Sequence, residues 1–287
     1  MTYTKEQLRE IQLKELELLK YFDALCQKHH LKYVLFYGTL LGAVRHQGFI
    51  PWDDDIDVCM LREDYNKLIE ISKSELDKNH TLQYSGEGTE YFCSYAKLRD
   101  ENTTYLETLI KDVDMSHGLF IDIFPVDNIP DSKFLRKIHC YRTYFLVSLR
   151  MARVKTLCTA SSSRKVRTVK RCLHMLSMLI PKKALEKHIN RVASKYNRKN
   201  TRQCTVAVVN SISESYNIFL RKEYLTDTIP MLFEDALFPV PKDYDEALTR
   251  CYGNYMELPP EDKRIANHNT QVIDVNNSYL NYKKQKI

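Results

Sequence analysis

The stretch YGTLLGAVRHQGFIPWDDDIDVCM, from Tyr37 to Met60, is unlike the rest of the sequence. It gathers four aspartates within five positions and continues at once into an apolar run; they are Asp53, Asp54, Asp55 and Asp57. An isolated buried carboxylate is unfavourable unless it is paired, hydrogen-bonded or bound to a metal. The cluster therefore needs a partner: an opposite charge, hydrogen-bond donors or a metal ion.

Two carboxylates of this cluster, together with a third one later in the sequence, are candidates for a metal site. Asp55 and Asp57 are one residue apart in a predicted strand over 55–61, so both side chains point to the same face. Asp122 lies on a second predicted strand, within 118–127. Oxygen ligands of this kind suit Mg²⁺, which proteins usually bind through one or two carboxylates together with substrate phosphates. We therefore expect Asp55, Asp57 and Asp122 to bind Mg²⁺, or Mn²⁺ in its place.

Asp-rich turns also cap helices and form side-chain turns, and Asp53 and Asp54 fit that simpler role. The preceding Gly38 and Thr39 favour the metal site, because they open a predicted helix at a strand end. Backbone N–H groups at such a helix start can receive a phosphate. A Gly-Thr turn, an aspartate pair about 16 residues later and a third acid on a strand resemble the nucleotidyltransferase fold.

Hydrophobic periodicity predicts the other elements. Thr4 and Gln7 form a capping-box pattern at the start of the first helix. The predicted helices cover 4–29, 38–45, 63–79 and 243–252. The predicted strands cover 33–36, 55–61, 81–85, 91–99 and 118–127. Residues 131–200 are typical of two or three basic helices broken near 159–163, and 281–287 are expected to be a frayed tail. The fold class is α/β (α+β), a mixed sheet flanked by helices.

We expect three segments along the 287 residues: a catalytic core over 1–130, a basic helical insertion over 131–202, and a segment over 203–287 that completes the active-site cleft. The chain has only seven glycines and neither a GxGxxG nor a P-loop motif, which argues against Rossmann and P-loop proteins. Its eight cysteines are scattered singly, so we expect reduced thiols and no structural zinc.

The insertion carries most of the positive charge. Between Lys133 and Arg202 there are 20 Lys and Arg against one acid, Glu186. Such helices bind anionic membranes, with LVSLRMARV (146–154) and LHMLSMLI (173–180) as apolar faces. Alternatively, these faces pack on the domain and the cations stay in water. No nucleic-acid-reading motif accompanies the charge, so we expect no nucleic acid partner.

The N-terminus has no apolar signal segment and no stretch is long enough to span a bilayer. We therefore expect a cytoplasmic protein with peripheral contact at the inner face of the cell membrane.

Longer motifs make a family resemblance specific. YGTLLGAVRHQGFIPWDDDIDV is very similar to the signature of the LicD family, a branch of the nucleotidyltransferase superfamily. The similarity continues in order through AKLRDENT (96–103), GLFIDIFPVDNIP (118–130) and FPVPKDYDEALTRCYGNYMELPPEDKR (238–264). The basic middle, 131–202, resembles the family only in being helical and positive.

The resemblance implies an enzyme, a CDP-alcohol-dependent phosphotransferase. It would transfer phosphocholine from CDP-choline to a sugar of a cell-surface glycan, such as lipopolysaccharide, teichoic acid or capsule, or to a lipid-linked precursor. Some relatives transfer other phospho-alcohols, such as ribitol phosphate. By position, Asp55 and Asp57 would bind the metal, and Asp122 would be a further ligand or the base for the acceptor hydroxyl. Gly38 and Thr39 would face the donor phosphates.

Other side chains are candidates for holding the donor. We expect Arg45, Lys97 and Arg99 to contact the pyrophosphate, with a solvated or ion-paired position as the alternative for each. Trp52 could stack on the base or on choline, because aromatic faces attract quaternary ammonium, or it could anchor a loop. Four tyrosines are weaker candidates for the same aromatic cage: Tyr37, Tyr244, Tyr252 and Tyr255.

The histidines are less informative. His46 and His117 are expected to make structural hydrogen bonds. Towards the C-terminus the family has a run such as RxxHH, whereas this chain reads RIANH over 264–268, so no role is assigned to His268.

Two other functions fit the sequence. One is true nucleotidyl transfer, which releases pyrophosphate instead of CMP. The other is a membrane-binding or polyanion-binding module built on an inactive transferase scaffold.

Overall fold

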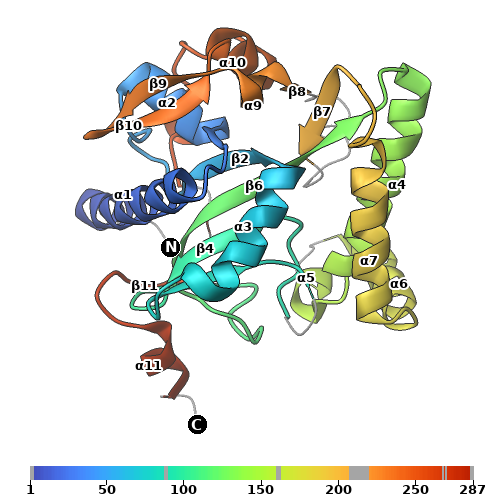
Figure 1. Cartoon of the computed structure of the whole chain (residues 1–287). Helices are drawn as coiled ribbons and strands as arrows, with labels where there is room; N and C mark the ends of the chain where they lie inside the picture. Colours follow the sequence, from blue (N-terminus) through green and yellow to red (C-terminus); the bar gives the residue numbers. More distant parts are fainter. Residues whose placement is uncertain are drawn as a thin grey trace.

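The computed structural model describes residues 3–86, 90–159, 163–206, 220–266, 268 and 270–284. A mixed sheet lies at the centre of the described chain, with the strand order β1-β2-β6-β4-β3 (Figure 1). These strands are β1 (Val34–Leu35), β2 (Asp57–Leu61), β3 (His80–Gln83), β4 (Ala96–Asp100) and β6 (Leu119–Ile129). Two further strands extend the sheet from the end of β6: β7 (Gln203–Val206) and β8 (Leu220–Arg221).

Strand β6 organises the sheet because three strands pair along its eleven residues. Its first half pairs antiparallel with β4, its middle pairs parallel with β2, and its end pairs antiparallel with β7. The parallel pairing places Asp57 directly beside Asp122, and the pairing with β4 places Lys97 on the other side of Asp122. The sheet topology thus brings three charged side chains from separate strands into one row.

Helices α1 (Lys5–Lys28) and α3 (Arg62–Glu75) both pack against this sheet. Thr4 caps α1 through the predicted capping box with Gln7. Ile11 of α1 packs against Phe120, so the even-numbered side chains of β6, including Asp122, lie on the α1 face. Ile121 and Ile123 point the other way, into the core that they share with Leu68 of α3.

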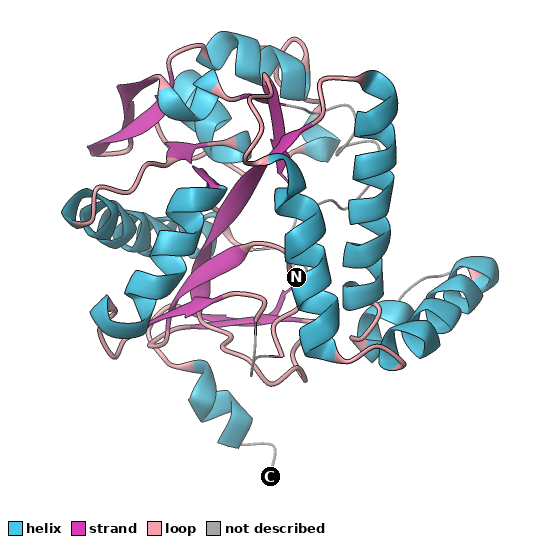
Figure 2. Cartoon of the chain, turned by 45° about the vertical axis from the view of Figure 1, so that its right-hand side comes forward, coloured by secondary structure: helices cyan, strands magenta, loops and turns pink. Residues whose placement is uncertain are grey.

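The basic insertion forms a group of helices at one side of the sheet (Figure 2). It comprises α4 (Lys133–Met151), the short α5 (Lys155–Thr159), α6 (Arg164–Met178), α7 (Lys182–Ala193) and the 3₁₀ turn η1 (Ser194–Tyr196). Leu146 and Val147 of α4 pack against Leu185 and Ile189 of α7. Of the turn predicted near 159–163, residues 160–162 lie outside the described residues.

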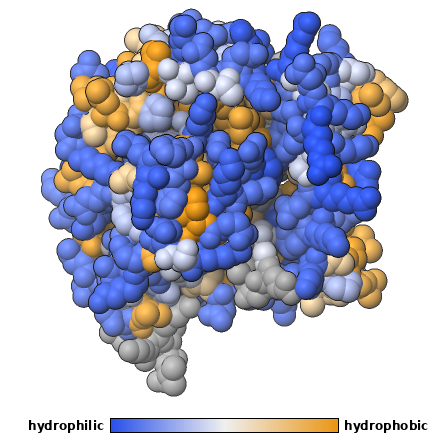
Figure 3. Space-filling model, in the orientation of Figure 1, coloured by the Kyte–Doolittle hydropathy of each residue, from blue (hydrophilic) through white to orange (hydrophobic). Residues whose placement is uncertain are grey.

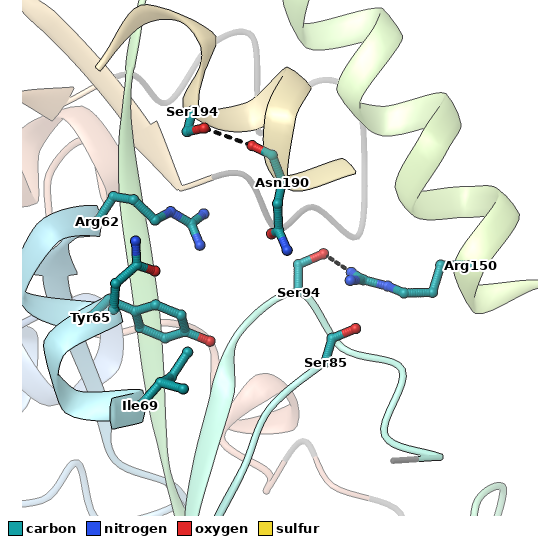
Figure 4. A pocket seen from close by; sticks show the side chains of 9 residues that line it. Arg62, Tyr65, Ile69, Ser85, Ser94, Arg150, Asn190 and Ser194 are labelled. Carbon is teal, nitrogen blue, oxygen red and sulfur yellow. Dashed lines mark hydrogen bonds between the residues drawn. The ribbon is translucent and has the colours of Figure 1, made fainter. Parts of the chain in front are cut away.

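A cavity of about 220 Å³ separates the insertion from the core (Figure 4). It lies between Arg62 and Tyr65 of α3, Arg150 of α4 and the end of α7. Both arginines are ion-paired: Arg62 with Asp127 on β6, and Arg150 with Glu186 on α7. Asp127 follows Asp122 by an odd number of residues, so this cavity lies on the face of the sheet away from the aspartate cluster.

The C-terminal third covers the β1 end of the sheet. It contributes α9 (Glu223–Thr226), the hairpin of β9 (Thr228–Phe233) and β10 (Ala236–Pro241), α10 (Tyr244–Tyr252) and the 3₁₀ turn η2 (Glu261–Lys263). Helix α10 packs against α2 (Tyr37–His46). Strand β11 (Thr270–Asp274) then pairs with β5 (Thr104–Glu107), and α11 (Tyr279–Lys284) follows.

The predicted α/β fold with a mixed sheet is confirmed, but several details differ. The strand predicted over 55–61 begins only at Asp57, so Asp55 lies in the preceding loop. The strand predicted over 91–99 begins only at Ala96, because Tyr91 and Phe92 are buried in a loop cluster with Ile110 and Met115. The β5–β11 pair was not predicted. The supposed frayed tail is helical up to Lys284, because Tyr279 and Tyr282 bond Glu101 and Asp274; residues 285–287 lie outside the description.

Among the described residues, every helix is too short or too polar to traverse a lipid bilayer.

Candidate active site

The centre of the site is the row formed by Asp57, Asp122 and Lys97. The Lys97 Nζ atom donates a 2.6 Å hydrogen bond to Asp122 Oδ1 and lies 3.2 Å from the centre of the Phe120 ring. Both members of this ion pair are almost completely buried. A buried ion pair is favourable only if its geometry is good. The short contact with Lys97 stabilises the carboxylate form of Asp122.

The loop before β2 brings further carboxylates to this row. Asp53, Asp54 and Asp55 each present an oxygen, and these atoms lie within 4.8 Å of one another, close enough to hold a metal ion. The Asp122 N–H donates to the Ile56 carbonyl (2.8 Å), which fastens this loop to β6. Five carboxylates therefore converge at the start of β2.

Burial determines the acidity of this group. It raises the pKa of Asp55 to about 6 and that of Asp57 well above its ordinary value, with help from neighbouring carboxylates. Burial also raises the pKa of Asp122, although the Lys97 ammonium opposes this rise. The ionised forms of these side chains are thus disfavoured without a compensating cation.

Gly38 and Thr39, at the start of α2, contact the acidic residues Asp53 and Asp57. Thr39 Oγ1 accepts a 2.8 Å hydrogen bond from the Asp57 N–H. A Cβ atom on Gly38 would lie 2.5 Å from Asp53 Oδ2, so only glycine permits this close approach. These contacts with the aspartates explain why a glycine and a hydroxyl residue stand at positions 38 and 39. The predicted contact of both residues with the donor phosphates stays a prediction.

Asp54 is fully buried and its oxygens are occupied by protein groups. Oδ2 accepts hydrogen bonds from the hydroxyls of Tyr3 (2.9 Å) and Tyr105 (3.0 Å), and Oδ1 lies 3.1 Å from Nδ1 of His268. Although burial alone would raise it, the contacts with His268 and the two tyrosines lower the pKa of Asp54. Asp54 therefore anchors the loop as a carboxylate.

The predicted substrate-binding side chains have different surroundings. Arg99 is fully buried, with its guanidinium 4.9 Å from the centre of the Phe120 ring. It donates to Gln83 Oε1 (2.6 Å) and to the Gly118 carbonyl (2.5 Å), which favours a structural role. Arg45 binds the Tyr255 carbonyl (2.7 Å) and so joins α2 to the C-terminal segment.

Trp52 is half-buried between His46, whose ring meets it edge-on, and Arg264, whose guanidinium lies 5.6 Å from its ring centre. The predicted donor contacts of Arg45, Trp52 and Lys97 stay predictions.

Comparison with known proteins identifies the family. Residues 30–144 match the model described as "LicD/FKTN/FKRP, nucleotidyltransferase domain". A protein of Haemophilus influenzae, "Lipopolysaccharide cholinephosphotransferase LicD", is 32% identical over 272 residues, which are 91% of this chain and 96% of that protein. The chain belongs to the LicD family. It is therefore a transferase.

Two proteins of uncharacterised function share shorter segments with this LicD family member. Protein RP689 of Rickettsia prowazekii is 43% identical over 24% of this chain and 26% of its own length. Protein RT0683 of Rickettsia typhi is 52% identical over 17% of this chain and 16% of its own length.

The sequence analysis assigned no role to several residues that lie at the site of this LicD family member, among them Tyr105. His268 was left without a role, and Tyr3 was not considered, because both reach Asp54 across long stretches of chain. Glu15 was overlooked as well, although a signal was present. It stands four residues from both Ile11 and Leu19, so it is an acid on the buried stripe of α1.

We predict that the His268–Asp54 pair stabilises the fold in a pH-dependent way. Although burial opposes it, the hydrogen bond to Asp54 and the charge of Asp55 raise the pKa of His268 from 6.5 to about 9. The stabilisation is then complete below about pH 6.5 and is lost as the pH rises through 9. Replacement His268→Gln should lower the free energy of unfolding by about 3 kcal/mol at pH 6 and by much less at pH 9.5.

Urea unfolding in EDTA at both pH values measures this difference. The exposed His188 provides the control, because His188→Gln should match the wild type throughout. A difference that is absent at pH 6, or that grows with pH, would contradict the pairing.

Proposed function

We propose that the protein is a Mg²⁺-dependent phosphotransferase that moves phosphocholine from CDP-choline to a sugar hydroxyl of a cell-surface glycan or its lipid-linked precursor. The observation that carries this proposal is the buried row of Asp57 and Asp122, with Asp55 beside it, at the start of β2. The choice of phosphocholine rests on the similarity to the Haemophilus influenzae protein, whose name gives that group and lipopolysaccharide.

The residues of the site fit a hard divalent cation. Asp55, Asp57 and Asp122 offer oxygen ligands alone, which Mg²⁺ and Mn²⁺ prefer over the nitrogen and sulfur that select zinc. Burial, together with the neighbouring carboxylates, raises the pKa values of Asp55 and Asp57, so their ionised forms need further positive charge. A bound cation would supply that charge and neutralise the donor pyrophosphate.

The chemistry is an in-line substitution at phosphorus. The acceptor hydroxyl attacks the phosphorus next to choline, a new P–O bond forms, and the bond to the CMP phosphate breaks, so CMP leaves. Asp122 has one oxygen on Lys97, and its other oxygen would take the hydroxyl proton or bind the cation. Phosphoryl transfer depends mainly on positioning and electrostatic stabilisation, which a fixed row of charges on strands provides.

Trp52 is our candidate for choline recognition. The Arg264 guanidinium lies 5.6 Å from the centre of the Trp52 ring, so this ring already attracts a cation in the structure. The quaternary ammonium of choline would be attracted by the same kind of interaction. Phospho-alditol donors such as CDP-ribitol carry no cation on the alditol, so they would lose this contact with the ring. They remain the alternative donors.

We predict that Asp55→Asn and Asp57→Asn each reduce CMP release from CDP-choline about 1,000-fold, since the loss of a cation ligand removes several kcal/mol of transition-state stabilisation. Chromatography of CMP measures this, and chelation of metal with EDTA should have the same effect on the wild type. The exposed Asp112→Asn is the control and should retain full activity. Normal turnover by both active-site variants would refute the proposed reaction.

The alternative of nucleotidyl transfer is favoured by the description of the matching family model as a nucleotidyltransferase domain. The same chromatography separates the two reactions, because nucleotidyl transfer releases pyrophosphate and leaves the nucleotide on the product. The binding-module alternative has less support, because the similarity to a named transferase covers nearly the whole chain.

We also propose that the insertion docks on an anionic membrane. The face LVSLRMARV is unavailable, because Leu146, Val147 and Leu149 are buried against α7. The face LHMLSMLI is exposed instead, with Met175, Met178 and Leu179 each more than half accessible.

Hydrophobic residues form two groups on the right-hand edge of the molecule in Figure 3, the side of α4 and α6 in Figure 1. Helix α6 adds five cations and no acid to its exposed methionines, which suits an anionic surface.

We predict that the wild type sediments with phosphatidylglycerol vesicles and much less with phosphatidylcholine vesicles. The triple variant Met175→Ser, Met178→Ser, Leu179→Ser should bind at least about tenfold more weakly, since three apolar side chains no longer enter the interface. A matched triple variant of exposed apolar residues on other elements should bind normally; it carries Leu237→Ser, Met256→Ser and Ile265→Ser. Equal binding of both triple variants would contradict docking through α6.

A further inference from the structure

Glu15 is a buried carboxylate that the proposed reaction does not yet use. It lies in the middle of α1 and has no solvent exposure. Neither of its oxygens accepts a hydrogen bond from the described residues. A carboxylate that is buried without a partner is strongly unfavourable, so an acid at this position suggests a function that uses its oxygens.

The neighbours of Glu15 on α1 locate it at the aspartate cluster. Gln12, three residues earlier and on the same helix face, donates hydrogen bonds to the carbonyls of Asp53 (2.9 Å) and Ile50 (3.4 Å). Ile11, four residues earlier, packs against Phe120, two residues before Asp122. The side chain of Glu15 therefore enters the space between the acidic loop and β6.

The charges around Glu15 agree with this position. After burial, the groups that raise its pKa most are the carboxylates of Asp55, Asp54, Asp53 and Asp122, in that order. Each of these is a repulsive neighbour. Helix α1 therefore inserts a further acid into a group of acids, where an apolar residue of similar size would be better tolerated.

The balance of charge leaves the cluster short of cations. Six carboxylates meet here, namely Glu15, Asp53, Asp54, Asp55, Asp57 and Asp122. Within the described residues, the basic groups that act on them are Lys97, Arg99 and His268. Two of these are already committed, Lys97 to Asp122 and His268 to Asp54. Oxygen ligands in excess of positive charge are the setting in which proteins bind divalent cations.

We propose that Glu15 is a further ligand, direct or through a coordinated water, of the divalent cation held by Asp55, so that α1 forms one wall of the metal site. This inference deepens the proposed function and rests on it. It assigns a metal-binding role to a helix that lies outside the segment matched by the family model, which begins at residue 30.

The test is a comparison of Mn²⁺ binding by the wild type and the Glu15→Gln variant, using calorimetry and the melting temperature of the full chain. Glu15→Gln should weaken Mn²⁺ binding at least tenfold and reduce the Mn²⁺-induced rise in melting temperature. Without metal, the variant should melt at the same temperature as the wild type or higher, because glutamine keeps the size of the side chain and removes its repulsion from the neighbouring carboxylates. Glu10→Gln, at an exposed position of the same helix, is the control and should behave as the wild type.

The outcomes separate the two proposals. If the wild type binds Mn²⁺ and Glu15→Gln binds it equally well, Glu15 is a protonated core residue and this inference is overturned, while the proposed reaction stands. If the wild type does not bind Mn²⁺, the metal dependence of the reaction and this inference fall together. Should Glu15→Gln not fold, as judged by circular dichroism, Glu15→Asp replaces it; this variant keeps the charge, shortens the reach, and is expected to bind Mn²⁺ more weakly.

Discussion

The parallel pairing of β2 with β6 brings two buried carboxylates together, and the surrounding structure has to compensate their repulsion. It puts Asp57 next to Asp122 inside the protein, where two like charges repel strongly and water cannot screen them. Lys97 on the adjacent strand β4 forms an ion pair with Asp122 and so compensates one of the two carboxylates. The proposed divalent cation would neutralise the remaining negative charge.

The loop that carries the other aspartates is held from all sides. Gln12 and Thr39 bond its backbone, Gly38 gives Asp53 room, and the group of Tyr3, Tyr105 and His268 fixes Asp54. These contacts come from Tyr3 and helix α1 near the N-terminus, from α2, from β5 and from the C-terminal segment. A site assembled from such distant parts of the chain exists only in the folded protein, and its ligands are positioned before a substrate arrives.

The sequence predicted the elements of this site better than their connections. The sequence correctly placed Asp57 and Asp122 on two strands, because alternation along a strand is a local property. Their neighbourhood in one row depends on the pairing of β2 with β6, which the sequence did not predict. Lys97 and Arg99 share the same local pattern, yet one binds Asp122 and the other is buried against Gln83, a difference made by packing alone. The contact of His268 with Asp54 spans 214 residues and leaves no trace in either local segment. Tyr91 and Phe92 have strong strand preferences, but burial in a loop cluster overrode them.

The proposed reaction depends on a divalent cation held by the acids at the start of β2. The most direct measurement is anomalous diffraction at the manganese edge from crystals soaked in Mn²⁺ and CDP. We predict a peak at coordination distance, about 2.1 Å, from oxygens of Asp55 and Asp57 and adjacent to Asp122. A map without a peak among these carboxylates, or with manganese bound only at another surface, would contradict it.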